Sequence, residues 1–309
     1  MRVLTLGAGA IGGYFGGRLS EGDTDVTFLV REARKRYLAA NGLRIESQFG
    51  NYTTPVKAIT KDEIDRPYDV VLLTCKAYDL PSAMESVRPA VGAETAILPL
   101  LNGLAHIDAL NAEFGAHRVL GGIAKIAATL TPGGVIKHLN DWHYITFGEQ
   151  SGELTDRVKS LKAAFDRTPV IASAVPDIMQ AMWEKIVHLT TVAGMTCMMR
   201  ASVGEISRVD GGSEAMIRFL QSNSEIADRE GFRPSEAFML EFRKLLSDET
   251  SAYTASMLRD LERGGPVEAD HILGFMLGKA RHHGLDDTLH RLAFLHVKAY
   301  EQRRAACRL

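Results

Sequence analysis

Short apolar runs alternate with longer amphipathic stretches in the first half of the chain. Residues 3–6, 26–30 and 69–74 are aliphatic or β-branched runs of strand length, and a stretch with helical spacing separates the first two. Residues 96–100 and 118–120 are further candidates for buried strands. Such alternation is typical of βαβ units, in which helices connect parallel strands. We therefore predict an α/β domain with a doubly wound, mostly parallel sheet.

Two additional segments are expected at the margins of this sheet. Residues 43–48 and 52–56 flank the turn pair Gly50-Asn51, which predicts a hairpin decorating the sheet. Residues 143–147 form a further polar-flanked strand candidate, and we expect this strand to extend the sheet at its edge.

The pattern changes where Pro169 and Pro176 bracket a short apolar run, and strand-like segments almost vanish beyond it. We place the domain boundary there, with an N-terminal domain of residues 1–172 and a C-terminal domain of residues 173–309. From Ile178 onward the spacing is helical, which predicts an all-α second domain. The candidate helix breaks are Gly204, Gly231 and Gly284.

Composition is that of an ordinary globular protein and narrows the set of partners. Among 309 residues, 36 Lys and Arg face 38 Asp and Glu, so no basic excess points to nucleic acid or an anionic membrane. No apolar run approaches the roughly 20 residues of a membrane span, and the first residues lack a signal-peptide pattern. The cysteines at 75, 197 and 307 have no metal-ligand spacing and suit a reducing compartment. We expect a cytoplasmic protein without a metal site.

The segment Gly7-Ala8-Gly9-Ala10-Ile11-Gly12 follows the first strand and opens a helix. In this context the first glycine permits a sharp turn, the second lets a pyrophosphate approach the backbone, and the third lets helix pack on strand. The free N–H groups and positive dipole end of the helix would face the phosphates. The predicted dinucleotide-binding residues of this turn are Gly7, Gly9, Ala10, Ile11 and Gly12.

The end of the second strand usually discriminates NADP from NAD. Here Arg31 comes first after the strand, and its guanidinium suits a 2′-phosphate. A solvated basic helix start is the alternative explanation, and Glu32 could instead hold the ribose 2′-OH. The pattern favours NADPH as the cofactor.

Polar side chains follow two further strands. Lys76 and Asn102 lie just beyond residues 69–74 and 96–100. Because the carboxyl ends of parallel strands line the ligand crevice, we expect both side chains to face the cofactor. Taken alone, each could be an ordinary loop residue, and Asn102-Gly103 is also a turn dipeptide.

Three residues of the second half are candidates for chemistry. Lys185 occupies an apolar helix face, where a lysine either snorkels to solvent or serves a function. Glu268 comes in a first helical turn after a proline, where the helix dipole alone would explain an acid. Ser256 is unremarkable by itself. The pair His282-His283 lacks ligand-spaced partners, so we interpret it as a polar C-terminal turn.

Together these motifs resemble the ketopantoate reductase (2-dehydropantoate 2-reductase) family over nearly the whole chain. The resemblance implies an N-terminal Rossmann domain and a helical C-terminal domain. The motifs that carry it, in order, are Gly7 to Gly13, Lys76, Leu101-Asn102-Gly103, Trp183-Glu184-Lys185, Ser256-Met257-Leu258-Arg259-Asp260, Glu268 and Gly274-Phe275.

The family's chemistry is the transfer of hydride from NADPH to a 2-oxo acid. Carried over to this chain, Lys185 would stabilise the developing oxyanion and donate the proton as general acid. Glu268 would orient Lys185 or a substrate hydroxyl, and Ser256 would hold the polar end of the substrate. Lys76 and Asn102 match positions that contact cofactor and substrate.

One departure affects the substrate. Better-known members carry asparagine one and two turns after the lysine, where this chain has Leu189 and Ala193. Losing polar ligands reduces discrimination for the hydroxyl that they bind. Three hypotheses remain: reduction of ketopantoate or a related branched 2-oxo acid, reduction of another oxo acid or an imine, and a non-catalytic NADP(H) sensor. The apolar C-terminal helices could support a homodimer.

Overall fold

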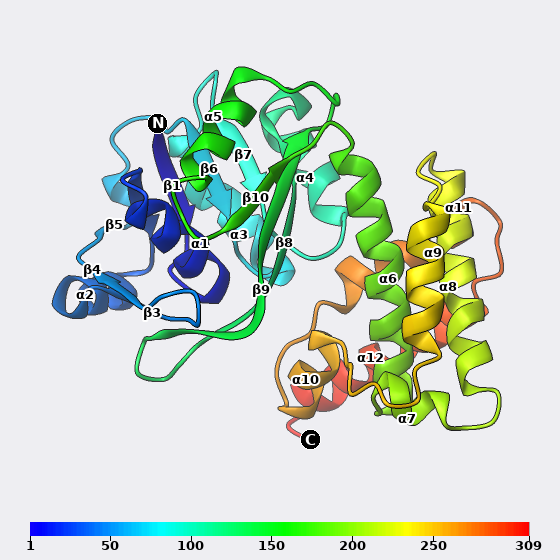
Figure 1. Ribbon diagram of the computed structural model, residues 1–309. Coiled ribbons are helices and arrows are strands. Elements are labelled where there is room, and N and C mark those ends of the chain that lie inside the picture. The colour runs from blue at the N-terminus through cyan, green and yellow to red at the C-terminus, as the bar shows by residue number, and fades with distance from the viewer. Residues whose placement is uncertain (309) are drawn as a thin grey trace. The chain divides into compact units, whose positions relative to one another are not determined.

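The computed structural model describes residues 1–308 and divides them into two compact units. Residues 1–101 and 106–178 form the sheet unit, and residues 102–105 together with those from 179 onward form the helical unit (Figure 1). The expected boundary after residue 172 falls inside β10 (Ile171–Ala174), which pairs with β9. The sheet unit therefore continues to Ile178.

The first sheet of the sheet unit is entirely parallel, as the alternating pattern predicts. Its strands run in the order β5-β2-β1-β6-β7, so the chain builds outward from β1 to one edge and then returns to β6. Ligands of such sheets bind where the order reverses, here at the carboxyl ends of β1 and β6. The strands are β1 (Arg2–Leu6), β2 (Asp25–Leu29), β5 (Lys57–Ile59), β6 (Val70–Leu73) and β7 (Ala96–Pro99).

A second sheet was not expected. It has the order β10-β9-β3-β4, and β8 pairs antiparallel with β9. Residues 143–147 were predicted at an edge, but they lie within β9 and pair with β8 on one side and β10 on the other. Residues 118–120 also differ from prediction, because a 3₁₀ turn ends at Arg118 and the long strand β8 follows. The other strands are β3 (Leu43–Glu46), β4 (Tyr52–Thr54), β8 (Leu120–Leu130) and β9 (Ile136–Glu149); β3 and β4 form the predicted hairpin.

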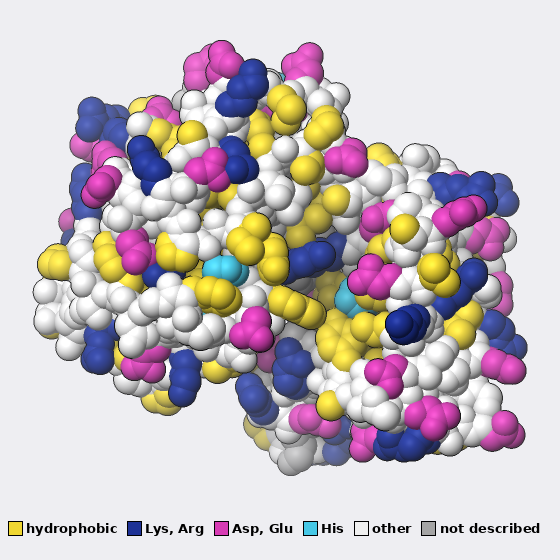
Figure 2. Space-filling model, viewed as in Figure 1, with side chains coloured by type: hydrophobic (Ala, Val, Ile, Leu, Met, Phe, Trp, Pro, Cys, Tyr) yellow, Lys and Arg dark blue, Asp and Glu magenta, His cyan; other side chains and the backbone are white. Residues whose placement is uncertain are grey.

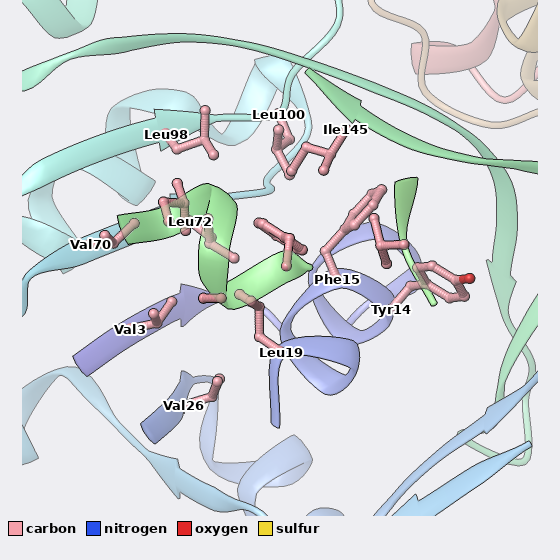
Figure 3. Close-up of a cluster of buried hydrophobic side chains, with 14 of the residues drawn as sticks. Val3, Tyr14, Phe15, Leu19, Val26, Val70, Leu72, Leu98, Leu100 and Ile145 are labelled. Atoms are coloured by element: carbon pink, nitrogen blue, oxygen red, sulfur yellow. The ribbon is translucent and has the colours of Figure 1, made fainter. Parts of the chain in front are cut away.

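The helix that follows the glycine turn, α1 (Ala10–Glu21), packs between the two sheets. A Cβ on Gly16 would meet Thr5 and Phe28 of the first sheet, and one on Gly17 would meet Leu43 and Ile45 of the second. Figure 3 shows the resulting core, in which side chains of α1 meet those of both sheets. The remaining helices of this unit are α2 (Glu32–Asn41), α3 (Leu80–Val87), α4 (Ala105–Phe114) and α5 (Asp156–Phe165).

All regular secondary structure among the described residues of the helical unit is helical, as predicted. Gly231 and Gly284 follow helices with positive φ, as helix-ending glycines do. Gly204 differs from its predicted role, because it lies inside α7 and packs on the backbone of Ser251. The helices are α6 (Ile178–Met199), α7 (Val203–Ser207), α8 (Gly212–Arg229), α9 (Glu236–Leu246), α10 (Ser256–Glu262), a π-helix (Asp270–Gly274), α11 (Phe275–His282) and α12 (Thr288–Ala305).

Acidic and basic side chains are interspersed on the molecular surface in Figure 2, which leaves no large patch of one sign on the face shown. None of the described helices is long and apolar enough to cross a membrane.

Candidate functional site

The glycine turn is held at the carboxyl end of β1 by its backbone. Gly7 has φ +90° and its N–H donates to Leu29 O at 2.9 Å. A Cβ on Gly12 would lie 2.3 Å from Thr74 Oγ1 and 2.4 Å from Gly7 O, so no larger residue fits there. Thr74 itself donates to Leu6 O at 2.7 Å, which ties the end of β6 to that of β1.

The same turn is open where a ligand would approach. A Cβ on Gly9 would meet nothing within 4 Å. Gly9 is the N-cap of α1, and the first turn of this helix, which contains Ala10, Ile11 and Gly12, holds no acidic residue. Unpaired helix N–H groups beside open space fit a dinucleotide pyrophosphate. The residues present therefore suit the cofactor that the turn predicts.

Arg31 lies at the start of the next helix. It is the N-cap of α2 and is exposed. Glu32, the alternative ribose ligand, lies 3.7 Å from Arg36 in an exposed ion pair. Such a pair contributes little to stability, so Glu32 is not held there.

Arg34 is a residue that the sequence analysis overlooked. Its guanidinium donates to Ala8 O at 2.9 Å and to Gly134 O at 3.3 Å. The guanidinium carbon also lies over the Tyr37 ring, 4.8 Å from the ring centroid. Burial lowers the pKa of Arg34. The side chain thus braces the glycine turn against the β8–β9 connection. Its spacing of three residues from Arg31, one helical turn, could have indicated a shared face.

Lys76 and Asn102 follow β6 and β7 as expected but differ in setting. Lys76 is exposed and opens a 3₁₀ turn, and its carbonyl accepts from Asp79 N at 2.9 Å. Asn102 belongs to the helical unit together with Gly103, which has φ +88°. A Cβ on Gly103 would lie 2.5 Å from His271 O, so this loop packs tightly on the π-helix.

The motif Trp183-Glu184-Lys185 lies in α6, and its three residues point in different directions. Trp183 is buried and stacks on Phe232, with ring centroids 5.7 Å apart. Glu184 Oε1 accepts the N–H of Ser235 at 2.8 Å, which anchors the start of α9. Lys185 is half-buried. The first two residues therefore fix the helix through contacts with neighbouring segments, and Lys185 lies on a half-buried side of α6 that we call the open face.

That open face of α6 also carries His188 and Leu189, which are half-buried like Lys185. On an ideal helix His188 lies about 60° to one side of Lys185 and Leu189 about 40° to the other. Ala193, one turn further, is fully buried. At the two positions where better-known family members carry asparagine, this chain therefore has the apolar Leu189 on the open face and the small Ala193 inside the core.

Ser256 and Glu268 lie in the same unit. Ser256 is half-buried and is the first residue of α10. Glu268 is 8% exposed and lies two residues before the turn of π-helix, and its carbonyl accepts from Ile272 N at 3.3 Å. Single π-helical turns are rare and occur frequently at functional sites. The buried Glu268 near such a turn therefore remains a candidate for a functional role.

The predicted site residues thus divide between the units. The residues in the sheet unit are Gly7, Gly9, Ala10, Ile11, Gly12, Arg31 and Lys76, and those in the helical unit are Asn102, Lys185, Ser256 and Glu268. Among the described residues, no group of three or more His, Cys, Asp or Glu could hold a metal ion.

Two family models match the chain in sequence. The model for ketopantoate reductase PanE/ApbA covers residues 3–152, and the model for its C-terminal part covers residues 177–301. The chain belongs to the ketopantoate reductase family. It is an oxidoreductase with the Rossmann-like and helical domains of that family.

Individual relatives span the same length. An uncharacterized oxidoreductase of Bacillus subtilis, YkpB, is 34% identical over 97% of this chain and 99% of its own. The 2-dehydropantoate 2-reductase of Geobacter metallireducens is 28% identical, with a TM-score of 0.86 over 97% and 99% of the two chains. The dimeric ketopantoate reductase of Staphylococcus aureus shares the fold at 18% identity, with a TM-score of 0.82 over 98% and 100%.

Proposed function

We propose that this protein reduces a 2-oxo acid to the 2-hydroxy acid with NADPH, and that ketopantoate or a related branched 2-oxo acid is the substrate. The observation that carries the proposal is Lys185, half-buried on the open face of α6 in a chain that also has the glycine turn. The overall reaction consumes one NADPH and one proton and yields NADP⁺.

The sheet unit would bind the cofactor. The N–H groups of Ala10, Ile11 and Gly12 would receive the pyrophosphate, and Arg31 would pair with the 2′-phosphate. Lys76, at the carboxyl end of β6, would contact the cofactor near the reacting end. When bound, NADPH supplies the hydride that reduces the carbonyl carbon.

The helical unit would handle the proton. Charge grows on the carbonyl oxygen as the carbon is reduced, and the Lys185 ammonium stabilises that charge and then donates its proton. Glu268 orients Lys185 or a substrate hydroxyl, while Asn102 and Ser256 hold the polar end of the acid. A general acid of this kind contributes about 10²–10⁴-fold to the rate.

A second substrate assignment is favoured by one observation. Leu189 is apolar and Ala193 is buried, so neither offers the amide with which relatives would bind a substrate hydroxyl. This favours another oxo acid, or an imine, with the same cofactor and the same proton donor.

We further propose a cytoplasmic enzyme that assembles as a homodimer. The three cysteines, Cys75, Cys197 and Cys307, lie far apart in the sequence and have no metal-ligand spacing, which suits a reducing compartment. The dimeric relative from Staphylococcus aureus supports the assembly.

The test is the variant Lys185→Ala, assayed by loss of NADPH absorbance with a panel of 2-oxo acids. We expect kcat to fall about 10²–10⁴-fold while the Kd for NADPH stays unchanged, because the ammonium acts on the carbonyl oxygen. Lys244→Ala, which removes an exposed lysine of α9, serves as the matched control. Wild-type turnover in Lys185→Ala, or no turnover of any 2-oxo acid by the wild type, would contradict the proposal.

A further inference from the structure

Three aromatic rings from separate segments meet at the open face of α6, which carries one of them, His188. The His188 ring stacks on Phe242 of α9, with centroids 4.1 Å apart, and on Tyr253, with centroids 5.7 Å apart. Tyr253 Oη and His188 Nε2 form a hydrogen bond of 3.1 Å. We call these three residues the ring group.

The position of Phe242 is set by contacts at the start of α9. The Ser235 hydroxyl accepts from Phe238 N at 3.3 Å and caps the helix, and Glu184 receives the Ser235 N–H. Phe238 then packs on Phe242 at 4.5 Å between centroids. Because Glu184 adjoins Lys185 in α6, one residue of the lysine motif also places the aromatic side of the ring group.

The position of Tyr253 is set by its backbone. Tyr253 O accepts from Val203 N and Ser251 O accepts from Gly204 N, both at 2.9 Å. A Cβ on Gly204 would lie 2.6 Å from Ser251 O, so the segment lies directly on the start of α7. The ring is therefore held on a fixed backbone that continues three residues later into Ser256.

The ring group connects the two segments that carry the substrate residues. His188 lies one helical turn after Lys185, and Tyr253 lies three residues before Ser256. Tyr253 Oη and His188 Nε2 are hydrogen bonded to each other, while the side chains of Phe242 and Leu189 carry no polar atom. A substrate hydroxyl buried against Phe242 and Leu189 would gain no hydrogen bond from them, and an unsatisfied buried hydroxyl costs binding free energy.

We propose that His188, Phe242 and Tyr253, with Leu189, form the wall that receives the substrate side chain, and that this wall selects 2-oxo acids with apolar side chains over hydroxylated ones. The inference rests on the proposed function and decides between its two substrate assignments. It assigns a specificity role to four residues of the helical unit outside the catalytic set.

The experiment compares two acids that differ by one hydroxyl group. Ketopantoate carries it, and trimethylpyruvate is the same molecule without it. Their Kd values are measured by calorimetry on the full-length protein saturated with NADP⁺, which cannot reduce either acid. An unsatisfied hydroxyl corresponds to a loss of about tenfold to hundredfold, so we expect trimethylpyruvate to bind more tightly by about that factor. Equal affinity, or tighter binding of ketopantoate, overturns the proposal.

Variants locate the selectivity in the wall. Phe242→Ala should weaken trimethylpyruvate about tenfold and leave the Kd for NADP⁺ unchanged, whereas Leu240→Ala, at a 71% exposed position of the same helix, should change neither. Leu189→Asn should shift the preference toward ketopantoate. If Phe242→Ala fails to fold, Phe242→Leu removes the ring but keeps an apolar side chain, and so tests the loss of the same ring contact. Identical affinities in the Phe242 variant and the Leu240 variant also overturn the proposal.

Binding and turnover separate the two proposals. If trimethylpyruvate binds more tightly but no NADPH is consumed with any oxo acid, the proposed reductase activity is wrong, whereas the proposed role of the wall is supported. If NADPH is consumed and ketopantoate binds more tightly, the proposed role of the wall is wrong, whereas the proposed reductase activity is supported.

Discussion

The glycine turn and the open face of α6 are built from opposite kinds of residue. In the turn, the geometry requires that side chains be absent, since Gly7 has φ +90° and a Cβ on Gly12 would clash with Gly7 O. On α6, the proposed chemistry and substrate selectivity would depend on the side chains present at Lys185, His188 and Leu189. A site made of backbone recognises what all dinucleotides share, while a site made of side chains can change one residue at a time. On this account, single substitutions would change the substrate more easily than the cofactor class.

The largest loss of stability and of cofactor binding should come from adding a side chain to the glycine turn. Gly12→Ala places a methyl group 2.4 Å from Gly7 O, where neither atom can move easily. Overpacking typically lowers the free energy of unfolding by up to about 3 kcal/mol, and we expect a loss of at least that size here. NADPH binding should be lost as well. Gly9→Ala, where nothing lies within 4 Å, should keep its stability yet weaken NADPH at least tenfold.

Thermal unfolding and fluorescence titration with NADPH check this pair. Gly278→Ala in α11 is the control, because its Cβ also meets nothing and its helix lies in the helical unit. If Gly9→Ala bound NADPH as well as Gly278→Ala does, the turn would not be the phosphate site.

The stability of the helical unit should depend on pH, because this unit contains a buried polar network with a histidine. His290 Nε2 donates to Asn223 Oδ1 at 3.0 Å, and Asn223 Nδ2 donates to Thr191 Oγ1 at 3.1 Å. Burial lowers the pKa of His290 from 6.5 to about 4, against the opposing effect of Asp286 and Asp287. The unfolded chain then binds the proton first. Stability should therefore be complete above about pH 6.5 and fall as the pH approaches 4, by up to about 3 kcal/mol.

Chemical denaturation at several pH values measures this loss. His290→Gln keeps a donor toward Asn223 without a titrating group, so its stability should depend less on pH over the same range. An equally steep loss in the variant would show that other groups carry it.

Replacing Arg31 or Arg34 should have smaller effects on cofactor affinity, and these effects should differ between the two arginines. Arg31→Ala removes the proposed 2′-phosphate partner and should weaken NADPH about tenfold while NADH is unaffected. Arg34→Ala removes the brace on Ala8 O and should weaken both cofactors alike, by less than tenfold. Arg36→Ala is the control on the same helix. Titration of each variant with both cofactors is the measurement, and equal losses of both in Arg31→Ala would reject its assignment.

The parts of the molecule that depend on local pattern could be predicted from the sequence. The parallel sheet, the hairpin around Gly50 and the helical second half all follow from spacing and turn residues within short windows. Gly7 and Gly12 were recognisable because only glycine satisfies their geometry.

The parts that depend on distant pairing could not. Residues 143–147 are enclosed only because β10 returns to pair with β9, and no local pattern encodes that return. The same holds for the site, where Arg34 meets Ala8 and Phe242 meets His188 across long stretches of chain. The π-helical turn after Glu268 likewise has no marker in the spacing.

The most direct test of the account compares Gly9→Ala and Lys185→Ala side by side, with kcat at saturating NADPH and the Kd for NADPH measured on each. We expect Gly9→Ala to raise the Kd at least tenfold with kcat nearly retained, and Lys185→Ala to lower kcat by at least about a hundredfold with the Kd retained. If both variants changed the same quantity, the division between a cofactor-binding turn and a catalytic helix face would be wrong.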